Sequence, residues 1–227
     1  MDRRAQKKAQ TRELVRTTAH RLFASRGFDA VTIADVAREA DVAVQTVFNH
    51  FATKEDLFFD GRVPWVDGVA GSVRDRAPGV GPLSALRAHL LEFMTSQLSS
   101  LTSPEERCYR DTLGASETLR SHERTMVFEA EHRLSGALLD AWTTPDESGE
   151  DPPVDPAITA PLTAAIWLAA VRVLIVENRQ RVAEGLEPTE VAATVELLGD
   201  RLMSYMQARS GTFHGLVTPP PGDRRAG

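Results

Sequence analysis

The fold of this chain is decided between residues 31 and 58, which read VTIADVAREADVAVQTVFNHFATKEDLF. From Ile33 onward, apolar residues recur at the spacing i, i+3, i+4 and i+7, and this pattern predicts an amphipathic helix of about two turns. Thr32, directly before it, has the side chain of a helix N-cap. A tight corner at residues 41–43 then leads into a second short helix, predicted over residues 44–52.

The second short helix divides its side chains between two faces. Val47 and Phe51 are predicted to point inward, which leaves Gln45, Thr46 and Asn49 on the opposite face. Two short helices at a sharp corner have the geometry of a helix-turn-helix, whose second helix fits the major groove of DNA. The same geometry also occurs in ordinary helical bundles, so the pattern alone leaves both interpretations open.

The segments on either side complete a small domain. An amphipathic helix over residues 7–25 precedes the pair and is expected to brace it. Gly27 ends this helix, because glycine adopts the left-handed conformation common after helix ends. Thr53 opens the following helix, and Asp56 stands at the spacing of a capping box. We therefore predict a helix-turn-helix domain over residues 1–53.

Charge is distributed unevenly along the 227 residues. The first 54 residues carry ten basic and six acidic side chains, a net charge of +4, whereas the whole chain carries −6. The remainder therefore carries −10. A basic N-terminal part on an acidic body indicates that the N-terminal part meets a polyanion, although a solvated charged face has the same composition.

The rest of the sequence favours helices throughout. We predict an all-α fold of about nine helices, with a C-terminal helical bundle over residues 54–210 and a disordered tail over residues 211–227. A hydrophobic content of 42% suffices for one or two cores. The single Cys108 indicates a reducing compartment, and we find no apolar run of the roughly 18 residues that cross a membrane. The N-terminus lacks the pattern of a signal peptide, so a cytoplasmic protein without membrane contact is expected.

The stretch that opens this section resembles the DNA-binding signature of the tetracycline-repressor (TetR) family. The resemblance covers roughly residues 11–59, and the run TVFNHFATKEDL over residues 46–57 carries it most specifically. It implies a ligand-responsive transcriptional regulator, most often a repressor, that binds a palindromic DNA operator as a dimer. The same resemblance implies that an unknown small-molecule effector binds in the C-terminal domain.

The resemblance also implies roles for individual residues. Thr32 is expected to contact a phosphate, and His50 and Lys54 are expected to contact the DNA backbone, which sets register rather than sequence. Gln45 is suited to bidentate pairing with adenine, whereas Val44 makes only apolar contacts. The predicted DNA-binding residues are Thr32, Val44, Gln45, Thr46, Phe48, Asn49, His50 and Lys54.

Three positions depart from the family pattern. Phe48 replaces a common tyrosine, which removes a phosphate hydrogen bond worth about 1 kcal/mol. Asp41 replaces the usual turn glycine, and aspartate tolerates the left-handed conformation better than most residues. Ala43 replaces a serine that caps the next helix, which costs about 1 kcal/mol of local stability. We expect these changes to weaken operator binding slightly and to leave the fold intact.

Dimerisation is expected because one short helix reads only a few base pairs, and useful specificity needs two such helices on one duplex. The last two helices are predicted to form the contact, since Ala164, Ala165 and Ala169 allow close helix approach. The predicted apolar stripe on the final helix consists of Val191, Val195, Leu198, Leu202 and Tyr205. Alternatively, these faces only cover their own domain.

The effector site is expected on the middle helices, where large side chains also serve as plain core. Arg172, on a largely apolar helix, either holds an anionic ligand or pairs with an acid such as Glu129 or Glu177 of the partner subunit. The predicted lining residues are Phe93, Met94, Cys108, Tyr109, Trp142, Trp167 and Arg172.

Two other classes of function compete with a regulator. The pairs His89-x-x-Glu92 and Glu129-x-x-His132 resemble ligands of di-iron bundles, but one pair has the reversed order. Zinc-ligand spacing, a phosphate-binding glycine loop and a nucleophile elbow are also missing from the sequence. We therefore expect no metal, no cofactor and no enzymatic activity. A helical adaptor without DNA binding would not need the polar side chains between residues 45 and 54.

Overall fold

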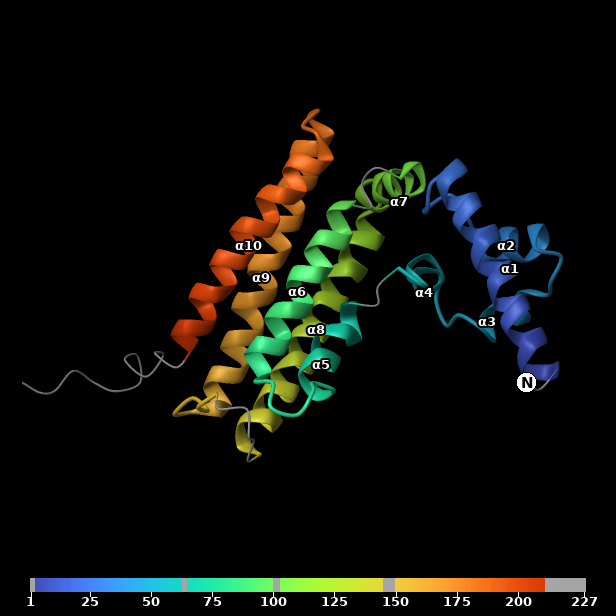
Figure 1. Cartoon of the computed structure of the whole chain (residues 1–227). Helices are drawn as coiled ribbons and strands as arrows, with labels where there is room; N and C mark the ends of the chain where they lie inside the picture. Colours follow the sequence, from blue (N-terminus) through green and yellow to red (C-terminus); the bar gives the residue numbers. More distant parts are fainter. Residues whose placement is uncertain (1–2, 63–64, 100–102, 145–149, 211–227) are drawn as a thin grey trace, which may run out of the picture. The chain divides into compact units, whose positions relative to one another are not determined.

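The structure is a computed structural model that describes residues 3–62, 65–99, 103–144 and 150–210. All regular structure in these residues is α-helical, which confirms the predicted all-α class (Figure 1). Ten helices are present there, where about nine were predicted, because the segment after Thr53 divides into two. The helices are α1 (Arg3–Arg26), α2 (Ile33–Glu39), α3 (Val44–Phe48), α4 (Lys54–Phe59), α5 (Trp65–Arg74), α6 (Pro82–Ser99), α7 (Pro104–Ala115), α8 (Glu117–Thr143), α9 (Pro156–Ala183) and α10 (Pro188–Ser210).

The chain forms two compact units. Unit 1 comprises Met1–Pro64 and Ser103–Met126, and unit 2 comprises Trp65–Thr102 and Val127–Gly227. Unit 1 therefore contains α1 to α4, α7 and the first turns of α8, whereas unit 2 contains α5, α6, the rest of α8, α9 and α10. The tail predicted over residues 211–227 lies outside the described residues.

The sequence signals around α1 and α2 act as predicted. α1 buries one face, on which Val15, Ala19 and Phe23 are almost inaccessible. The helix ends at Arg26, and Gly27 follows with a φ of +81°, a left-handed conformation that a side chain would disfavour. The end of α1 at Gly27 therefore determines where α2 begins, because the connector after Gly27 leads directly to the N-cap of α2.

An aromatic cluster forms the core of unit 1. The Phe58 ring centroid lies 5.9 Å from that of Phe23 and 5.6 Å from that of Phe28, and Tyr109 of α7 stacks on Phe58 at 4.8 Å. Such aromatic pairs add stability beyond the area that they bury. The cluster therefore holds α1, α4 and α7 together, although α7 is distant from α1 and α4 in sequence.

Unit 2 is built around α6, which packs against α5, α9 and α10 (Figure 1). Leu86, Leu90 and Met94 of α6 are almost inaccessible to solvent. α10 approaches this face closely at Gly199, where a Cβ atom would lie 2.8 Å from the Cε of Met94. The glycine therefore permits the close contact between α6 and α10.

α9 is both long and apolar. By length and composition alone, its segment Pro156–Val182 could cross a membrane, because small and apolar residues outnumber its few polar ones. This differs from the expectation from the sequence that no apolar run reaches that length. Half of its most apolar window is buried inside the structure, as in the core helix of a bundle. The other side of α9 carries exposed apolar residues, which bear on how the chain associates.

Candidate nucleic-acid interface

α3 presents two rows of side chains to solvent. Val44 and Phe48 are separated by one helical turn, with 42% and 46% of their surfaces exposed. Gln45 and Asn49 form the neighbouring row, and the Gln45 Nε2 donates a hydrogen bond of 3.2 Å to the Asn49 Oδ1. Val47 is buried and anchors the helix from below. The exposed surface of α3 thus combines an apolar row with an amide row.

The N-terminus of α2 is capped by Thr32 together with the carboxylate of Asp35, in the first turn of the same helix. The backbone N–H and the hydroxyl of Thr32 donate to Asp35 at 3.0 and 2.6 Å, and the Asp35 N–H donates to the Thr32 hydroxyl at 3.1 Å. These bonds, together with one from Arg38, lower the pKa of Asp35 to about 2. The predicted N-cap is confirmed, and a phosphate that reaches the Thr32 hydroxyl has to displace its bond to Asp35.

Asp41 forms the corner between α2 and α3. Its φ of +52° makes it the one non-glycine residue with positive φ among the residues that the structure describes. This confirms that aspartate takes the left-handed conformation in place of glycine. The next cap is weak, as predicted, because Ala43 has extended backbone but no side-chain hydrogen bond to α3.

Ala43→Ser is expected to raise the free energy of unfolding by about 1 kcal/mol, because a serine hydroxyl at the N-cap can accept a hydrogen bond from a backbone N–H in the first turn of α3. Urea unfolding monitored by circular dichroism measures the change. The control is Ala34→Ser, an exposed site inside α2, where serine is expected to lower stability by about 0.5 kcal/mol. Equal effects at both sites would contradict the capping role.

Lys54 is held by the connector before α2. Its Nζ donates to the carbonyl oxygens of Phe28 and Val31, each at 3.0 Å, and lies 4.1 Å from the centroid of the Phe28 ring. An ammonium group has three N–H donors, so one remains for a DNA phosphate. Lys54 therefore joins α4 to the start of the helix-turn-helix, in addition to its predicted DNA contact.

Lys54→Met is expected to lower the free energy of unfolding by about 1–2 kcal/mol, because two carbonyl groups lose a charged donor while the apolar stem is kept. Thermal unfolding measures this loss. Lys7→Met, at an exposed position on α1, serves as the control and should leave the melting temperature unchanged. A Lys54→Met protein as stable as wild type would show that the two bonds do not support the fold.

His50 lies half-buried just after α3. Partial burial, aided by the charges of Lys8 and Arg12, lowers the pKa of its imidazole. The ring is therefore neutral at pH 7 and acts there as a hydrogen-bonding group rather than a cation. Arg12, which the sequence did not single out, donates to the His50 carbonyl at 2.8 Å and lies 4.4 Å from the Phe51 ring centroid. Arg12 thus fixes the end of α3 against α1.

A comparison with family models identifies this arrangement. The model described as bacterial regulatory proteins, tetR family, matches residues 15–60, which span most of α1 and all of α2, α3 and α4. The chain carries a TetR-family DNA-binding domain. This confirms the family that the motif between residues 31 and 58 indicates.

Solved structures extend the likeness in fold to most of the chain. The SmeT–triclosan complex has a TM-score of 0.57 at 18% identity and covers 94% of this chain and 100% of its own; SmeT is the repressor of the Stenotrophomonas maltophilia multidrug efflux pump SmeDEF. NalD, the secondary repressor of the MexAB-OprM multidrug efflux pump in Pseudomonas aeruginosa, has a TM-score of 0.51 at 20% identity, covering 86% and 96%. At these identities the likeness establishes the TetR fold alone. Comparison with curated proteins finds no match.

The effector residues predicted from the TetR resemblance are divided between the two units. Met94, Trp142 and Trp167 are buried in unit 2, where Phe93 is half-buried. Arg172 is exposed on α9. The three buried side chains act as core of unit 2 in this structure, and a ligand among them requires that they move apart.

The two remaining predicted effector residues belong to unit 1. Cys108 is half-buried on α7, and Tyr109 is packed between the Phe58 ring and the guanidinium of Arg62, which lies 4.2 Å from the Tyr109 ring centroid. Burial raises the pKa of the Tyr109 phenol, so the group stays protonated. Tyr109 thus completes the aromatic core of unit 1, the unit that contains the DNA-binding helices.

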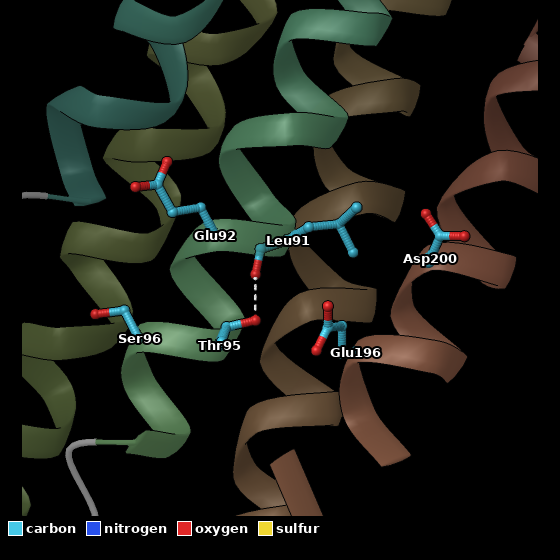
Figure 2. Close-up of a pocket in the computed structure, with 6 residues that line it drawn as sticks. All are labelled: Leu91, Glu92, Thr95, Ser96, Glu196 and Asp200. Atoms are coloured by element: carbon cyan, nitrogen blue, oxygen red, sulfur yellow. Dashed lines mark hydrogen bonds between the residues drawn. The ribbon is translucent and has the colours of Figure 1, made fainter. Parts of the chain in front are cut away.

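An open cavity of about 470 Å³ lies between α6 and α10 (Figure 2). Glu196 and Asp200 line it from α10, and Asp200 also accepts a hydrogen bond from Arg87. The volume falls within the range of small-molecule sites, and the carboxylates make the space negative. Its lining, which includes none of the seven predicted effector residues, consists of Leu91, Glu92, Thr95, Ser96, Glu196 and Asp200.

The residues of the alternative di-iron interpretation are separately engaged or exposed. A Cβ at Gly68 would lie 3.1 Å from the His89 Nε2, so this ring packs against the backbone of α5. Glu129 accepts a hydrogen bond from Arg133, and His132 is exposed. Within the described part of the chain, no group of three or more His, Cys, Asp or Glu side chains could hold a metal ion.

The apolar surface of the last two helices differs from the predicted one. Val191 and Val195, assigned to a subunit contact, are buried within unit 2, so that assignment was wrong. Eight of the fifteen exposed large apolar residues that the structure describes lie on α9 and α10. They are Ile158, Leu162, Ile166, Val173, Val176, Leu197, Leu198 and Tyr205.

Proposed function

We propose that this protein is a ligand-responsive transcriptional regulator that binds a palindromic DNA operator as a dimer and represses the promoter beneath it. The observation that carries the proposal is α3, which exposes amide and apolar side chains inside a TetR-family DNA-binding domain. Gln45 and Asn49 offer amide groups that suit adenine edges, and α3 is narrow enough for the major groove. These features support a DNA-binding regulator rather than an enzyme, and we propose that it acts in the cytoplasm.

The contact between subunits is proposed to use the exposed faces of α9 and α10. These helices pack side by side within unit 2 (Figure 1). Apolar patches that a monomer leaves uncovered are typical of association surfaces. On α9, Leu162 and Ile166 are one turn apart, and the small Ala169 follows on the exposed side. Two copies that pair through these faces form a four-helix contact and bring two α3 helices to one duplex.

The effector is proposed to act by favouring one of two arrangements of the paired DNA-binding domains. A ligand shifts this equilibrium only by its difference in affinity between the two arrangements. The likeness to the SmeT–triclosan complex makes triclosan a reasonable first probe. A titration of triclosan against the DNA complex, followed by fluorescence anisotropy, should release DNA; binding without release would contradict the proposed switch for this probe.

Selection from a random duplex library at near-physiological salt tests the DNA-binding proposal. The expected result is enrichment of one palindromic sequence whose half-sites are separated by about one helical turn or more. Arg12→Ala should weaken enrichment, because it loosens the end of α3. If folded protein enriches no sequence, a helical adaptor that acts by protein contact replaces the proposed function.

A further inference from the structure

The apolar row of α3 is unusual within unit 1. In the described part of that unit, large apolar side chains are exposed at three positions only, Leu14, Val44 and Phe48. Two of these three stand one turn apart on the helix that the proposed function places in the major groove. Exposed apolar groups cost free energy in water, so a surface that covers both would gain from them.

The major groove of B-DNA offers one apolar group, the C5-methyl of thymine. Valine and phenylalanine have no hydrogen-bonding atoms in their side chains, so they cannot distinguish bases by donors and acceptors. The adjacent amide row suits adenine N6 and N7, which lie across the base pair from that methyl group. The apolar row of α3 therefore matches the thymine methyl group, and the amide row matches the adenine edge, that an A·T pair presents in the major groove.

We propose that Val44 and Phe48 determine specificity by covering thymine methyl groups, so that each operator half-site contains A·T pairs in register with the two rows. This inference rests on the proposed DNA-binding function and specifies the bases that the same site recognises. Val44 lies at the start of α3 and Phe48 at its end, so each side chain covers a different base step. Phe48, which lacks the hydroxyl of a tyrosine, thus gains an apolar role in place of a phosphate hydrogen bond.

Replacement of thymine by deoxyuridine tests the proposal, because it removes the methyl group and keeps the base-pairing atoms. The probes are the duplexes enriched from the random library, with each thymine replaced singly and then symmetrically in both half-sites. At the covered positions, the dissociation constant should rise about fourfold for one methyl and about fifteenfold for the symmetric pair. Anisotropy titrations at fixed salt measure these ratios.

Variants link each methyl group to its side chain. Val44→Ala and Phe48→Ala should each bind the thymine duplex more weakly and should lose the preference for thymine over uracil at one position. Leu14→Ala removes an equally exposed apolar side chain from α1 and should keep the full preference. Each of the three side chains is partly exposed, at 42–48%, so the variants should remain folded at the temperature of the titrations, which thermal unfolding checks.

Three results would overturn the inference. They are uracil substitutions that all leave wild-type binding within twofold, enriched half-sites without thymine, or alanine variants that keep the wild-type preference. The absence of any enriched duplex would be a different result, because it would overturn the proposed DNA-binding function together with this inference. A sequence-specific protein that is insensitive to the methyl groups would leave the proposed function standing.

Discussion

Ile166→Arg is expected to convert the proposed dimer into monomers and to weaken operator binding at least 100-fold. Ile166 is exposed near the middle of the apolar face of α9, so the variant should fold as a single chain. In the symmetric contact, two arginines would be buried close together without partners, and an uncompensated buried charge costs about 3–5 kcal/mol. Loss of the dimer lowers operator affinity, because one α3 helix reads too few base pairs.

Sedimentation velocity measures the change in mass from a dimer to the 24.9 kDa chain. The matched control is Phe128→Arg, which places the same charge at the most exposed large apolar residue described, 71% exposed on α8. This control should remain dimeric and bind the operator as wild type does. If Ile166→Arg stays dimeric while Phe128→Arg dissociates, the contact lies on α8 rather than on α9.

The second large effect is expected from the amide row of α3. Gln45→Ala and Asn49→Ala should each cost about 1–3 kcal/mol of specific binding, which is roughly 10-fold to 100-fold in affinity. The loss should be confined to the enriched operator, because these side chains read bases rather than phosphates. Affinity for random duplex and the dependence of binding on salt should therefore stay close to wild type.

The double variant adds a test of how the row works. Because Gln45 donates to Asn49 at 3.2 Å, the two amides orient each other, and their losses should be less than additive. Parallel titrations of operator and random duplex measure both quantities. A uniform loss on every duplex would mean that the amides contact the DNA backbone and would remove them from base recognition.

The positions and caps of the two short helices could be predicted because local signals fix them, although α3 ends at Phe48 and not at residue 52 as predicted. Thr32, Gly27 and Asp41 act through their own backbone geometry or nearest neighbours, and each adopts the predicted conformation. A cap or a left-handed turn depends on a few residues in sequence, so tertiary packing does not have to be known. The TetR motif lies entirely within this locally determined region.

The surfaces of unit 2 could not be predicted in the same way. α9 carries apolar residues on both its buried and its exposed sides, so periodicity does not distinguish core from contact surface. On α10, Val195 is buried while Leu197 is exposed, and only the packing against α6 and α9 decides between them. Tyr109 likewise belongs to unit 1 because α7 returns to Phe58, a contact between segments distant in sequence.

Lys54 shows the same limit at a single side chain. The TetR resemblance implies that Lys54 contacts the DNA backbone. Its bonds to the carbonyl groups of Phe28 and Val31 depend on how the connector folds over α4, which no spacing rule specifies. The DNA contact of Lys54 stays a prediction, and its structural bonds were found only in the structure.

Hydroxyl-radical footprinting of the wild-type protein on its enriched duplex tests the central claim most directly. Two copies that each place α3 in the major groove should protect two patches of equal size, related by a twofold axis and about one helical turn or more apart. In the Ile166→Arg variant, both protected patches should disappear. A single protected patch that survives in this variant would contradict a dimeric operator-binding protein.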